Sequence, residues 1–182
     1  YPNENLSPEL VAKAIANYER TIISRNSDFD RWIQGDQSAM TAQQINGFKL
    51  FVDPNKGNCS VCHSAPNFTD NGFHNLGLES FGLNNPDLGR YNEKPIRLMK
   101  GAFKTPTLRE ITQTAPYFHD GSSPSLDSVM VHYILGGIVK DNLSPNLKAL
   151  NLTQQESQDI IAFLKALSSP PITVILPELP LN

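Results

Sequence analysis

The sequence predicts a mainly helical fold with long irregular loops and little β structure. Three observations support this prediction. Apolar residues recur at helical spacing in four stretches, each opened by a residue suited to cap a helix. Fourteen prolines and eleven glycines are spread over 182 residues, which favours short helices joined by substantial loops. Between Ser64 and Met99 the regular periodicity is lost altogether.

Residues 6–24 are predicted to form the first amphipathic helix. Ser7 is a suitable N-cap, and Pro8 occupies the first helical position, where its missing N–H costs nothing. We expect its apolar stripe to be an ordinary core face. The stripe consists of Leu10, Val11, Ala14, Ile15, Tyr18 and Ile22.

Two further helices are expected before residue 53. Asn26 to Asp28 break the first helix, and Gly35-Asp36 form the next turn. Thr41 and Gln44 form a T-x-x-Q capping box. Trp32 is interpreted as a packed core indole in preference to a member of an electron path. The apolar faces comprise Phe29, Trp32 and Ile33 in the short helix, and Ile45, Phe48, Leu50 and Phe51 in the longer one.

The segment from Ser64 to Met99 is expected to be a long loop. Asn67–Asn75 and Asn84–Arg90 are rich in Asn, Asp and Gly, which is turn chemistry. Asp70-Asn71-Gly72 lacks the spaced ligands and closing Glu of an EF-hand and is interpreted as a turn. A loop this long is unusual in a small domain unless it surrounds something.

The second half of the chain is predicted to contain three helices and an arm. Thr105-Pro106 is expected to open a short helix with Leu108 and Ile111, whereas the segment Thr114–Gly121 fits neither helix nor strand. Two longer helices follow, and residues 170–182, punctuated by proline, are interpreted as an extended arm. Ser125 caps the first of these helices, which ends at Gly136-Gly137 and has the apolar stripe Leu126, Val129, Met130 and Tyr133. The second helix begins with the Thr153/Glu156 capping box. Its apolar stripe is Ile160, Ile161, Phe163, Leu164 and Leu167.

The five residues Cys59-Ser60-Val61-Cys62-His63 read C-x-x-C-H, the attachment signature of a c-type haem. Two thiols at this spacing can each form a thioether with a porphyrin vinyl group, and His63 is then delivered to the iron as an axial ligand. A zinc site would need further regularly spaced ligands, but the chain has no third cysteine. A thioredoxin-like pair would open a helix, whereas Gly57-Asn58 precede Cys59. We therefore interpret the motif as the attachment site of one haem c.

Composition excludes other classes of function. The net charge is −3 with a pI of about 5.8, and the basic residues are dispersed, so no nucleic-acid footprint is present. No apolar run approaches the roughly 20 residues of a membrane helix. No nicotinamide or flavin fingerprint appears.

Because haem c is attached outside the cytoplasm, and because no signal peptide is seen, we expect a mature, processed periplasmic chain or a fragment of a longer one.

The second axial ligand decides what such a haem can do. An open face binds peroxide and other small ligands, whereas Met, His or Tyr closes it. Met130 and Tyr133 share the inward face of one predicted helix, and His132 lies about 100° away from Tyr133. His74 either hydrogen-bonds a haem propionate or lines the loop. The candidates for the distal ligand are Met99, His119, Met130, His132 and Tyr133.

Four segments together resemble the bacterial dihaem cytochrome c peroxidase and MauG family, and more closely its C-terminal haem domain. They are Ile15–Arg31, Cys59–His63, Phe103–Leu108 (FKTPTL) and Thr114–Gly121 (TAPYFHDG). The resemblance implies a cytochrome c-like haem domain over residues 1–169. It also implies that this chain is the electron-relay half of a peroxide-using enzyme, with no catalytic residue of its own. The peroxidatic haem would then lie on an N-terminal domain or partner chain that this sequence does not include, and a redox protein would serve as electron donor or substrate.

The resemblance also implies two sets of ligands. The family's distal ligand lies on the helix after PYFHDG, at the position of Tyr133, with Met130 as the alternative. A phenolate ligand stabilises Fe(III) and so lowers the reduction potential of the haem. A Tyr ligand at this position therefore favours a MauG-like protein. A calcium ion between the two domains would be held partly by the backbone carbonyls of Thr114 and Pro116.

Two alternatives remain open at the level of the sequence. One is a stand-alone monohaem electron-transfer cytochrome without peroxidase activity, and the other is a haem-stabilised binding or sensing module. The segment Thr114–Gly121 favours the two-haem assembly, because a free electron shuttle has no use for an interface segment. The lack of a peroxidatic site in this chain argues the other way.

Overall fold

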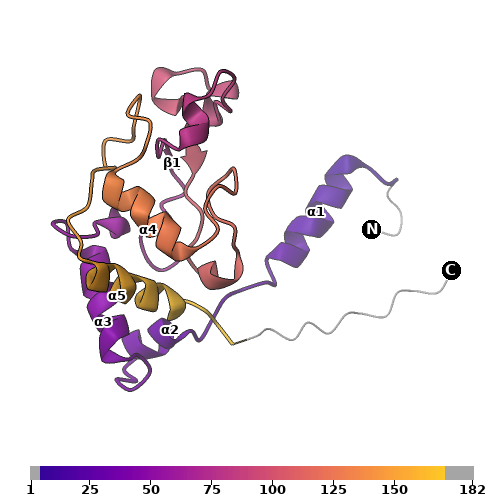
Figure 1. Cartoon of the computed structure of the whole chain (residues 1–182). Helices are drawn as coiled ribbons and strands as arrows, with labels where there is room; N and C mark the ends of the chain where they lie inside the picture. Colours follow the sequence, from indigo (N-terminus) through magenta and orange to yellow (C-terminus); the bar gives the residue numbers. More distant parts are fainter. Residues whose placement is uncertain (1–4, 171–182) are drawn as a thin grey trace.

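The computed structural model describes residues 5–170, and it confirms a mainly helical architecture (Figure 1). The α-helices are α1 (Pro8–Glu19), α2 (Asp28–Ile33), α3 (Ala42–Val52), α4 (Leu126–Leu135) and α5 (Gln154–Lys165). Five short 3₁₀ turns are η1 (Cys59–Val61), η2 (Glu79–Gly82), η3 (Arg90–Asn92), η4 (Arg97–Met99) and η5 (Ile111–Gln113). The one sheet in the described residues pairs β1 (Phe73–His74) antiparallel with β2 (Phe103–Lys104).

The four predicted caps are confirmed. The Ser7 hydroxyl accepts a hydrogen bond from the Leu10 N–H at 3.3 Å at the start of α1. Reciprocal capping boxes open α3, α4 and α5, so each of these helices begins where its side-chain oxygen satisfies a free N–H. Gly136 ends α4 in the left-handed conformation (φ 68°). A Cβ there would lie 2.5 Å from the Ala149 backbone nitrogen, so the position requires glycine both for its φ and for its space.

Helices α3 and α5 pack against each other and hold the core. They meet at Gly47, where a Cβ would overlap the Asp159 carbonyl, so the two backbones approach closely because this residue has no side chain. An aromatic cluster fills the space beside this crossing, with ring centroids 5.1–6.3 Å apart. Its members are Phe29, Trp32, Phe48, Phe51, Phe68 and Phe163. Trp32 is therefore a packed core side chain, as predicted.

The segment between α3 and α4 is irregular, as the loss of periodicity predicts. In Figure 1 it lies above the α3–α5 pair and is tied together by the short β1–β2 ladder, in which Phe73 pairs with Lys104 and His74 with Phe103. Among residues 5–170, no helix has the length and apolar character that crossing a bilayer would require. The predicted arm of residues 170–182 lies, beyond Pro170, outside the described residues.

The prediction that the first helix buries an ordinary core face is wrong. Helix α1 is shorter than the expected range 6–24 and stands apart from the body of the fold (Figure 1). Leu10 is buried, but Val11, Ile15, Tyr18 and Ile22 are 45–53% exposed. The apolar spacing does predict a helix, but α1 ends at Glu19 and the chain runs without helix from there to Ser27, which leads α1 away from the core.

The short helix predicted at Thr105-Pro106 does not form. Residues 105–108 have no regular structure, and only the 3₁₀ turn η5 follows. The Thr107 hydroxyl donates to the Asn67 carbonyl at 2.6 Å and accepts from the Arg109 N–H at 3.1 Å, so it competes with helical bonding. Glu110 is left-handed (φ 60°), which also ends any helix at this point.

Candidate haem site

The cysteine motif lies on a tight turn that follows α3. The Gly57 N–H bonds the Leu50 carbonyl at 3.0 Å, and a Cβ at Gly57 would approach that oxygen to 2.7 Å. Asn58 is left-handed (φ 49°), which turns the chain into η1. The N–H groups of Cys62 and His63 then both bond the Cys59 carbonyl, at 3.3 and 2.8 Å. Residues three and four apart on a helical turn share one face, so this turn brings both sulfurs and the imidazole to the same side.

His63 is held in the form that can bind a metal. Its Nδ1 lies 2.9 Å from the Phe68 carbonyl oxygen, which can only accept, so Nδ1 carries the proton. Nε2 is then left with a free lone pair, the arrangement in which a second hydrogen bond fixes the tautomer of a ligating histidine. Burial lowers the pKa of His63, which favours the neutral, ligating ring. Phe68 is left-handed (φ 52°) and almost fully buried, and its carbonyl is thereby fixed in place.

The thiols of the motif are not poised as a redox pair or as thiolate ligands. Burial, with a smaller contribution from Cys62, raises the pKa of Cys59 to about 12. Burial also raises the pKa of Cys62, and the charge of Asp70 adds to the effect. Reactive and metal-binding cysteines need the thiolate, which electropositive surroundings favour. The surroundings here disfavour it, in agreement with the interpretation that both sulfurs form thioethers.

Asp70 and His74 lie beside Cys62, a grouping that the sequence does not predict. One ligand atom from each of these three residues lies within 4.8 Å of the others. His74 Nε2 is 2.8 Å from an Asp70 carboxylate oxygen, and its Nδ1 is 3.1 Å from the Ser144 hydroxyl. A structural zinc site has four ligands, whereas this group offers three and both nitrogens of His74 already have partners. We interpret it as a polar wall beside the motif; the i, i+4 spacing of Asp70 and His74 was the signal available in the sequence.

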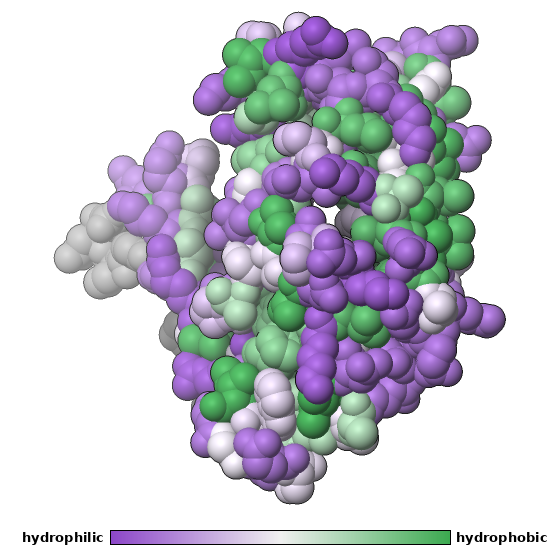
Figure 2. All heavy atoms as spheres, turned by 90° about the vertical axis from the view of Figure 1, so that its left-hand side faces the viewer, coloured by the Kyte–Doolittle hydropathy of each residue, from purple (hydrophilic) through white to green (hydrophobic). Residues whose placement is uncertain are grey.

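A cavity of about 730 Å³ opens in front of the motif. This volume lies within the range of about 300–1,000 Å³ that is usual for cofactor sites. The motif, the β1–β2 region, α4, α5 and the segment 144–151 all contribute to its wall. Figure 2 shows a hollow near the centre of the face that it presents, bordered by both apolar and polar side chains. Cys59, Cys62 and His63 line the cavity together with Val129, Met130 and Tyr133 of α4.

The structure separates the candidates for the second axial ligand. Tyr133, Met130 and His119 line the cavity, whereas Met99 and His132 are not among its lining residues. His132 lies within 2.9 Å of the Leu76 carbonyl through Nε2, on another side of α4. His119 stacks on Phe103, with ring centroids 3.4 Å apart and planes 10° apart. Tyr133 and Met130 are therefore the cavity-lining candidates that α4 supplies, as the helical spacing predicts.

Tyr133 is a half-buried side chain on the cavity wall, close to the thiols of the motif. Burial raises its pKa well above the ordinary value, and the nearby Cys59 and Cys62 thiols contribute in the same direction. A phenol in such a place stays protonated unless a cation takes the place of its proton. The centroid of its ring lies 6.4 Å from the ring centroid of Phe118, a residue of the irregular segment before α4.

The residues expected to bind calcium lie at the edge of the same cavity. Thr114 and Pro116 are exposed and line its wall, in a segment that no helix or strand spans. Tyr117 fixes this segment, because its backbone exchanges hydrogen bonds with Ser123 and its hydroxyl donates to the Ile111 carbonyl at 3.0 Å. The calcium site stays a prediction.

Basic side chains on the cavity wall are a further feature that sequence reasoning missed. Lys56, Lys104, Arg109 and Lys148 line it, although they are dispersed over almost 100 residues. Two of them have acidic partners: Lys56 pairs with Glu156 at 2.7 Å and Arg109 with Asp30 at 2.8 Å. Haem bears two propionates, so a basic wall suits it. Spacing along the chain gave no signal for this grouping.

The donor set and the cavity thus fit haem c. Two protonated thiols, an imidazole with a free Nε2 and a largely apolar cavity of cofactor size are what covalent attachment of a haem requires. A mainly helical chain with these features is of the c-type haem protein class.

Comparisons with known proteins define the relationship more closely. The sequence profile of the family described as Di-haem cytochrome c peroxidase matches residues 1–38. The chain is 37% identical over 182 residues to the methylamine utilization protein MauG of Methylophilus methylotrophus, covering 99% of this chain and 53% of that protein. It is 38% identical over 175 residues to the cytochrome c peroxidase Ccp of Escherichia coli K12, covering 92% of this chain and 34% of that protein.

A solved structure agrees with these relatives. A MauG-like protein associated with microbial copper homeostasis superposes with a TM-score of 0.81 at 27% identity, covering 93% of this chain and 59% of that one. The resemblance to the family of MauG and the dihaem cytochrome c peroxidases is therefore confirmed, and this chain is related to those proteins. It spans about half the length of the MauG relative and a third of the Escherichia coli one.

Proposed function

We propose that this chain is a haem c oxidoreductase domain, the electron-relay half of a dihaem, peroxide-using enzyme of the cytochrome c peroxidase and MauG type. One observation supports the proposal above the others: the cysteine motif and Tyr133 face one cavity of cofactor size. The names of the relatives agree, since they are MauG and cytochrome c peroxidases. The chain corresponds to about half of MauG, so the peroxidatic haem would belong to another domain or a partner chain.

In this proposal Cys59 and Cys62 hold the haem covalently, and His63 and Tyr133 are its axial ligands, with Met130 as the alternative to Tyr133. Bound haem would supply one-electron transfer at its iron. The chain's own residues have supporting roles. The Phe68 carbonyl orients His63 through Nδ1, and the Asp70–His74 pair borders the motif. The apolar stripe of α4 makes one wall of the cavity apolar.

Two further points belong to the proposal. The backbone carbonyls of Thr114 and Pro116 would supply part of a calcium site, since hard oxygen ligands suit that ion. The chain would work in the periplasm, because haem c is attached outside the cytoplasm. Its electron donor or substrate would be a redox protein, and the second haem domain would be its nearest partner.

The alternative function is a monohaem electron-transfer cytochrome without peroxidase activity. The same cavity and ligands would serve it, and the described residues contain a single C-x-x-C-H motif. What favours the relay role is that the relatives which this chain matches over 92–99% of its length are named MauG and cytochrome c peroxidase.

A haem count against protein mass, followed by a peroxide assay, tests the proposal. We expect one covalently bound haem per chain by alkaline pyridine haemochrome, and none in Cys59→Ala/Cys62→Ala. We also expect no peroxide turnover by the chain alone, and turnover when this chain replaces the matching half of Methylophilus methylotrophus MauG. A haem-loaded chimera without peroxide turnover would leave the monohaem cytochrome as the better description. A chain without covalent haem would contradict both functions.

A further inference from the structure

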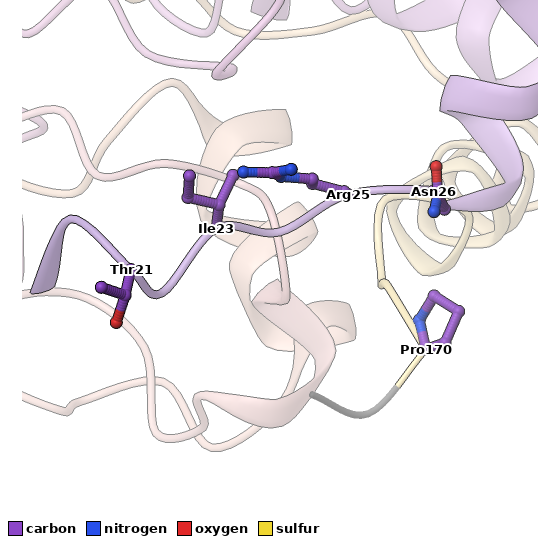
Figure 3. A pocket seen from close by; sticks show the side chains of 5 residues that line it. All are labelled: Thr21, Ile23, Arg25, Asn26 and Pro170. Carbon is purple, nitrogen blue, oxygen red and sulfur yellow. The ribbon is translucent and has the colours of Figure 1, made fainter. Parts of the chain in front are cut away.

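A second recess, of about 410 Å³, lies at the segment that follows α1 (Figure 3). It is lined by Thr21, Ile23, Arg25, Asn26 and Pro170. Arg25 is the one charged side chain among these five, and the five include no carboxylate, thiol or imidazole. The recess therefore lacks the groups that bind or tune a redox centre. A chemically richer group lies beside the attachment motif.

That group is the carboxylate–imidazole pair of Asp70 and His74, which stands outside the set of residues that would ligate the haem. His74 Nε2 lies 2.8 Å from an Asp70 carboxylate oxygen. One carboxylate oxygen and one ring nitrogen of the pair lie within 4.8 Å of the Cys62 sulfur. The Asp70 N–H also donates to the Cys62 carbonyl at 2.7 Å. The main chain thus holds the pair against the second cysteine of the motif.

A chain of hydrogen bonds fixes the Asp70 carboxylate. One of its oxygens accepts from the Gly72 N–H at 2.8 Å, and the other faces His74 Nε2. Since an ionised carboxylate can only accept, Nε2 carries the proton, and in the neutral ring Nδ1 accepts from the Ser144 hydroxyl at 3.1 Å. Burial alone would raise the pKa of Asp70, but its hydrogen bonds, first of all that from His74, outweigh burial and lower it. The carboxylate is therefore ionised at neutral pH and held in one place.

The charge of Asp70 reaches the motif through space. His74 and Cys62 line the cavity, whereas Asp70 is not among the lining residues. Burial raises the pKa of Cys62, and the charge of Asp70 adds to this effect. Burial lowers the pKa of His63, while the bond to the Phe68 carbonyl and the charge of Asp70 oppose that change. A negative charge that favours a proton on the His63 ring also favours the more positive, ferric state of an iron bound to that ring.

We propose that Asp70 is a potential-setting residue, whose fixed negative charge stabilises the ferric state of the haem held by the motif and so lowers its reduction potential. His74 is a positioning residue that acts through Asp70. This inference rests on the proposed function, which places a haem at the motif. It adds to the effect of a Tyr133 ligand a second contribution that does not touch the iron. A low potential makes the ferrous haem a stronger electron donor, which suits a domain that passes electrons on.

Redox titration of the haem-loaded chain at pH 8, above the range in which histidine normally titrates, tests this role. Asp70→Asn keeps the size of the side chain and an oxygen that can accept from the Gly72 N–H, but it removes the charge. At a fixed electrode potential we expect the ferric-to-ferrous ratio to fall at least about threefold. This is a rise in midpoint potential of about 28 mV, since a tenfold change corresponds to 59 mV for one electron.

Two variants control for the substitution. Asp70→Glu keeps the charge and should stay close to the parent chain. Asp36→Asn is the matched control, because the Asp36 carboxylate likewise accepts from the N–H two residues further on, that of Ser38 at 3.1 Å. Asp36 does not line the cavity, so its substitution should leave the midpoint potential unchanged.

Salt and a double-mutant cycle separate an electrostatic role from a structural one. The Asp70 side chain is 27% exposed, so ions screen part of its charge. The difference in potential between the parent chain and Asp70→Asn should therefore shrink as the ionic strength rises from about 0.01 M to about 1 M. His74→Phe fills similar space without a donor, so it should raise the potential less than Asp70→Asn does. In the Asp70→Asn background it should add nothing.

The outcomes separate this inference from the proposed function. A midpoint potential that is unchanged in Asp70→Asn overturns the inference, and so does a shift that Asp70→Glu shares in full or that is independent of salt. A fall in potential in His74→Phe also overturns it, because the pair would then carry a compensating imidazolium. If Asp70→Asn does not bind haem, Asp70→Gln and Asp70→Glu, which share one shape and differ in charge, replace it. Haem-loaded chains whose potential ignores Asp70 contradict this inference alone, whereas a parent chain without covalent haem contradicts the proposed function itself.

Discussion

Tyr133 is the single side chain on which the redox character of the proposed site depends most. It lines the cavity from α4, and its surroundings raise the pKa of its phenol. In water-poor surroundings a phenolate forms only if a cation compensates its charge, and ferric iron would do so. As an axial ligand, Tyr would hold the potential below that of a Met-ligated haem.

We expect Tyr133→Phe to change the ferric absorption and electron paramagnetic resonance spectra from those of a six-coordinate haem toward an open, high-spin one. Tyr133→Met should raise the midpoint potential, because thioether ligation favours Fe(II). Met130→Leu is the matched control, since Met130 occupies the preceding turn of the same helix and is only 5% exposed. Unchanged ferric spectra in Tyr133→Phe, with altered spectra in Met130→Leu, would assign the ligand to Met130 instead.

A second residue-scale feature is the pairing of Asp30 with Arg109. The two guanidinium nitrogens lie 2.8 and 2.9 Å from the two carboxylate oxygens, and both side chains are about one-eighth exposed (12% and 13%). Burial alone would raise the pKa of Asp30, but its hydrogen bonds to Arg109 and Ser27 outweigh burial and lower it. The pair joins α2 to the loop that borders the cavity.

Asp30→Asn should lower the free energy of unfolding by about 1.5–3 kcal/mol at pH 7, the usual contribution of hydrogen bonds to charged groups. Asp28→Asn removes the exposed pair with Arg31 and should cost about 0.5 kcal/mol. Urea unfolding at pH 7 compares the variants. A loss in Asp30→Asn no larger than that in Asp28→Asn would show that the buried pair adds little.

The same variant predicts a pH dependence. Because the folded-state pKa of Asp30 lies below its ordinary value of 3.8, its stabilisation is complete above that value and is lost as the pH falls through the folded pKa. The difference in urea midpoint between the parent chain and Asp30→Asn should therefore shrink on going from pH 5 to pH 2.5. A difference that grows on acidification would contradict the lowered pKa.

At the residue scale the sequence predicted the attachment motif and the two ligand candidates of α4 because both signals are local. C-x-x-C-H is contiguous, and Met130 and Tyr133 share a helical face by spacing alone. The grouping of Cys62 with Asp70 and His74 depends on how the loop folds back, and the basic wall joins residues from distant segments. Contacts of that kind leave little trace in a single sequence.

At the scale of the elements, the crossing of α3 and α5 determines how closely the core helices approach. Gly47 is buried at the crossing, and an added Cβ would overlap the Asp159 carbonyl and lie 2.9 Å from the Phe163 Cβ. These neighbours are a backbone carbonyl and the Cβ of a buried side chain, so neither can move unless α5 moves as well. The aromatic cluster beside the crossing would have to move with it.

Gly47→Ala should therefore destabilise the chain by about 1–3 kcal/mol, although alanine is the better helix former. Gly82→Ala is the control, because there the added Cβ meets only a Val139 methyl, at 3.0 Å, and should change stability by less than about 0.5 kcal/mol. Thermal or urea unfolding of both variants measures the difference. Equal stability of the two would mean that α3 and α5 can separate at little cost.

The elements themselves show what local patterns can predict. Four caps and the stripes of α4 and α5 were found from the sequence, since caps and periodicity are properties of adjacent residues. The helix expected at Thr105-Pro106 failed because a tertiary bond from Thr107 to the Asn67 carbonyl competes with it. The first helix was found but its burial was not, because periodicity predicts that a face is apolar without saying which partner covers it.

At the scale of the whole molecule, the fold has two parts that depend differently on a bound group. The α3–α5 pair and its aromatic cluster pack directly on each other. Helix α4 and the β1–β2 region instead face a cavity of about 730 Å³, so much of their apolar surface has its partner only when the cavity is filled. The long loop from Ser64 to Met99 was predicted to surround a bound group, and its place beside this cavity agrees with that interpretation.

We therefore expect removal of the haem to loosen one part of the molecule more than the other. In Cys59→Ala/Cys62→Ala, which cannot attach haem, amides of α4 and of β1–β2 should exchange at least tenfold faster than in the haem-loaded chain, equivalent to about 1.4 kcal/mol of local stability. Amides of α3 and of the buried face of α5 should change much less, because the aromatic cluster that holds them does not need the cavity filled. Hydrogen–deuterium exchange at matched concentration measures both.

Ser60→Ala, inside the motif but without a thiol, controls for substitution of the turn and should retain the haem. Equal exchange of α4 in the haem-free and haem-loaded chains would show that the cavity walls are stable without their occupant, and the group would then serve electron transfer without supporting the fold.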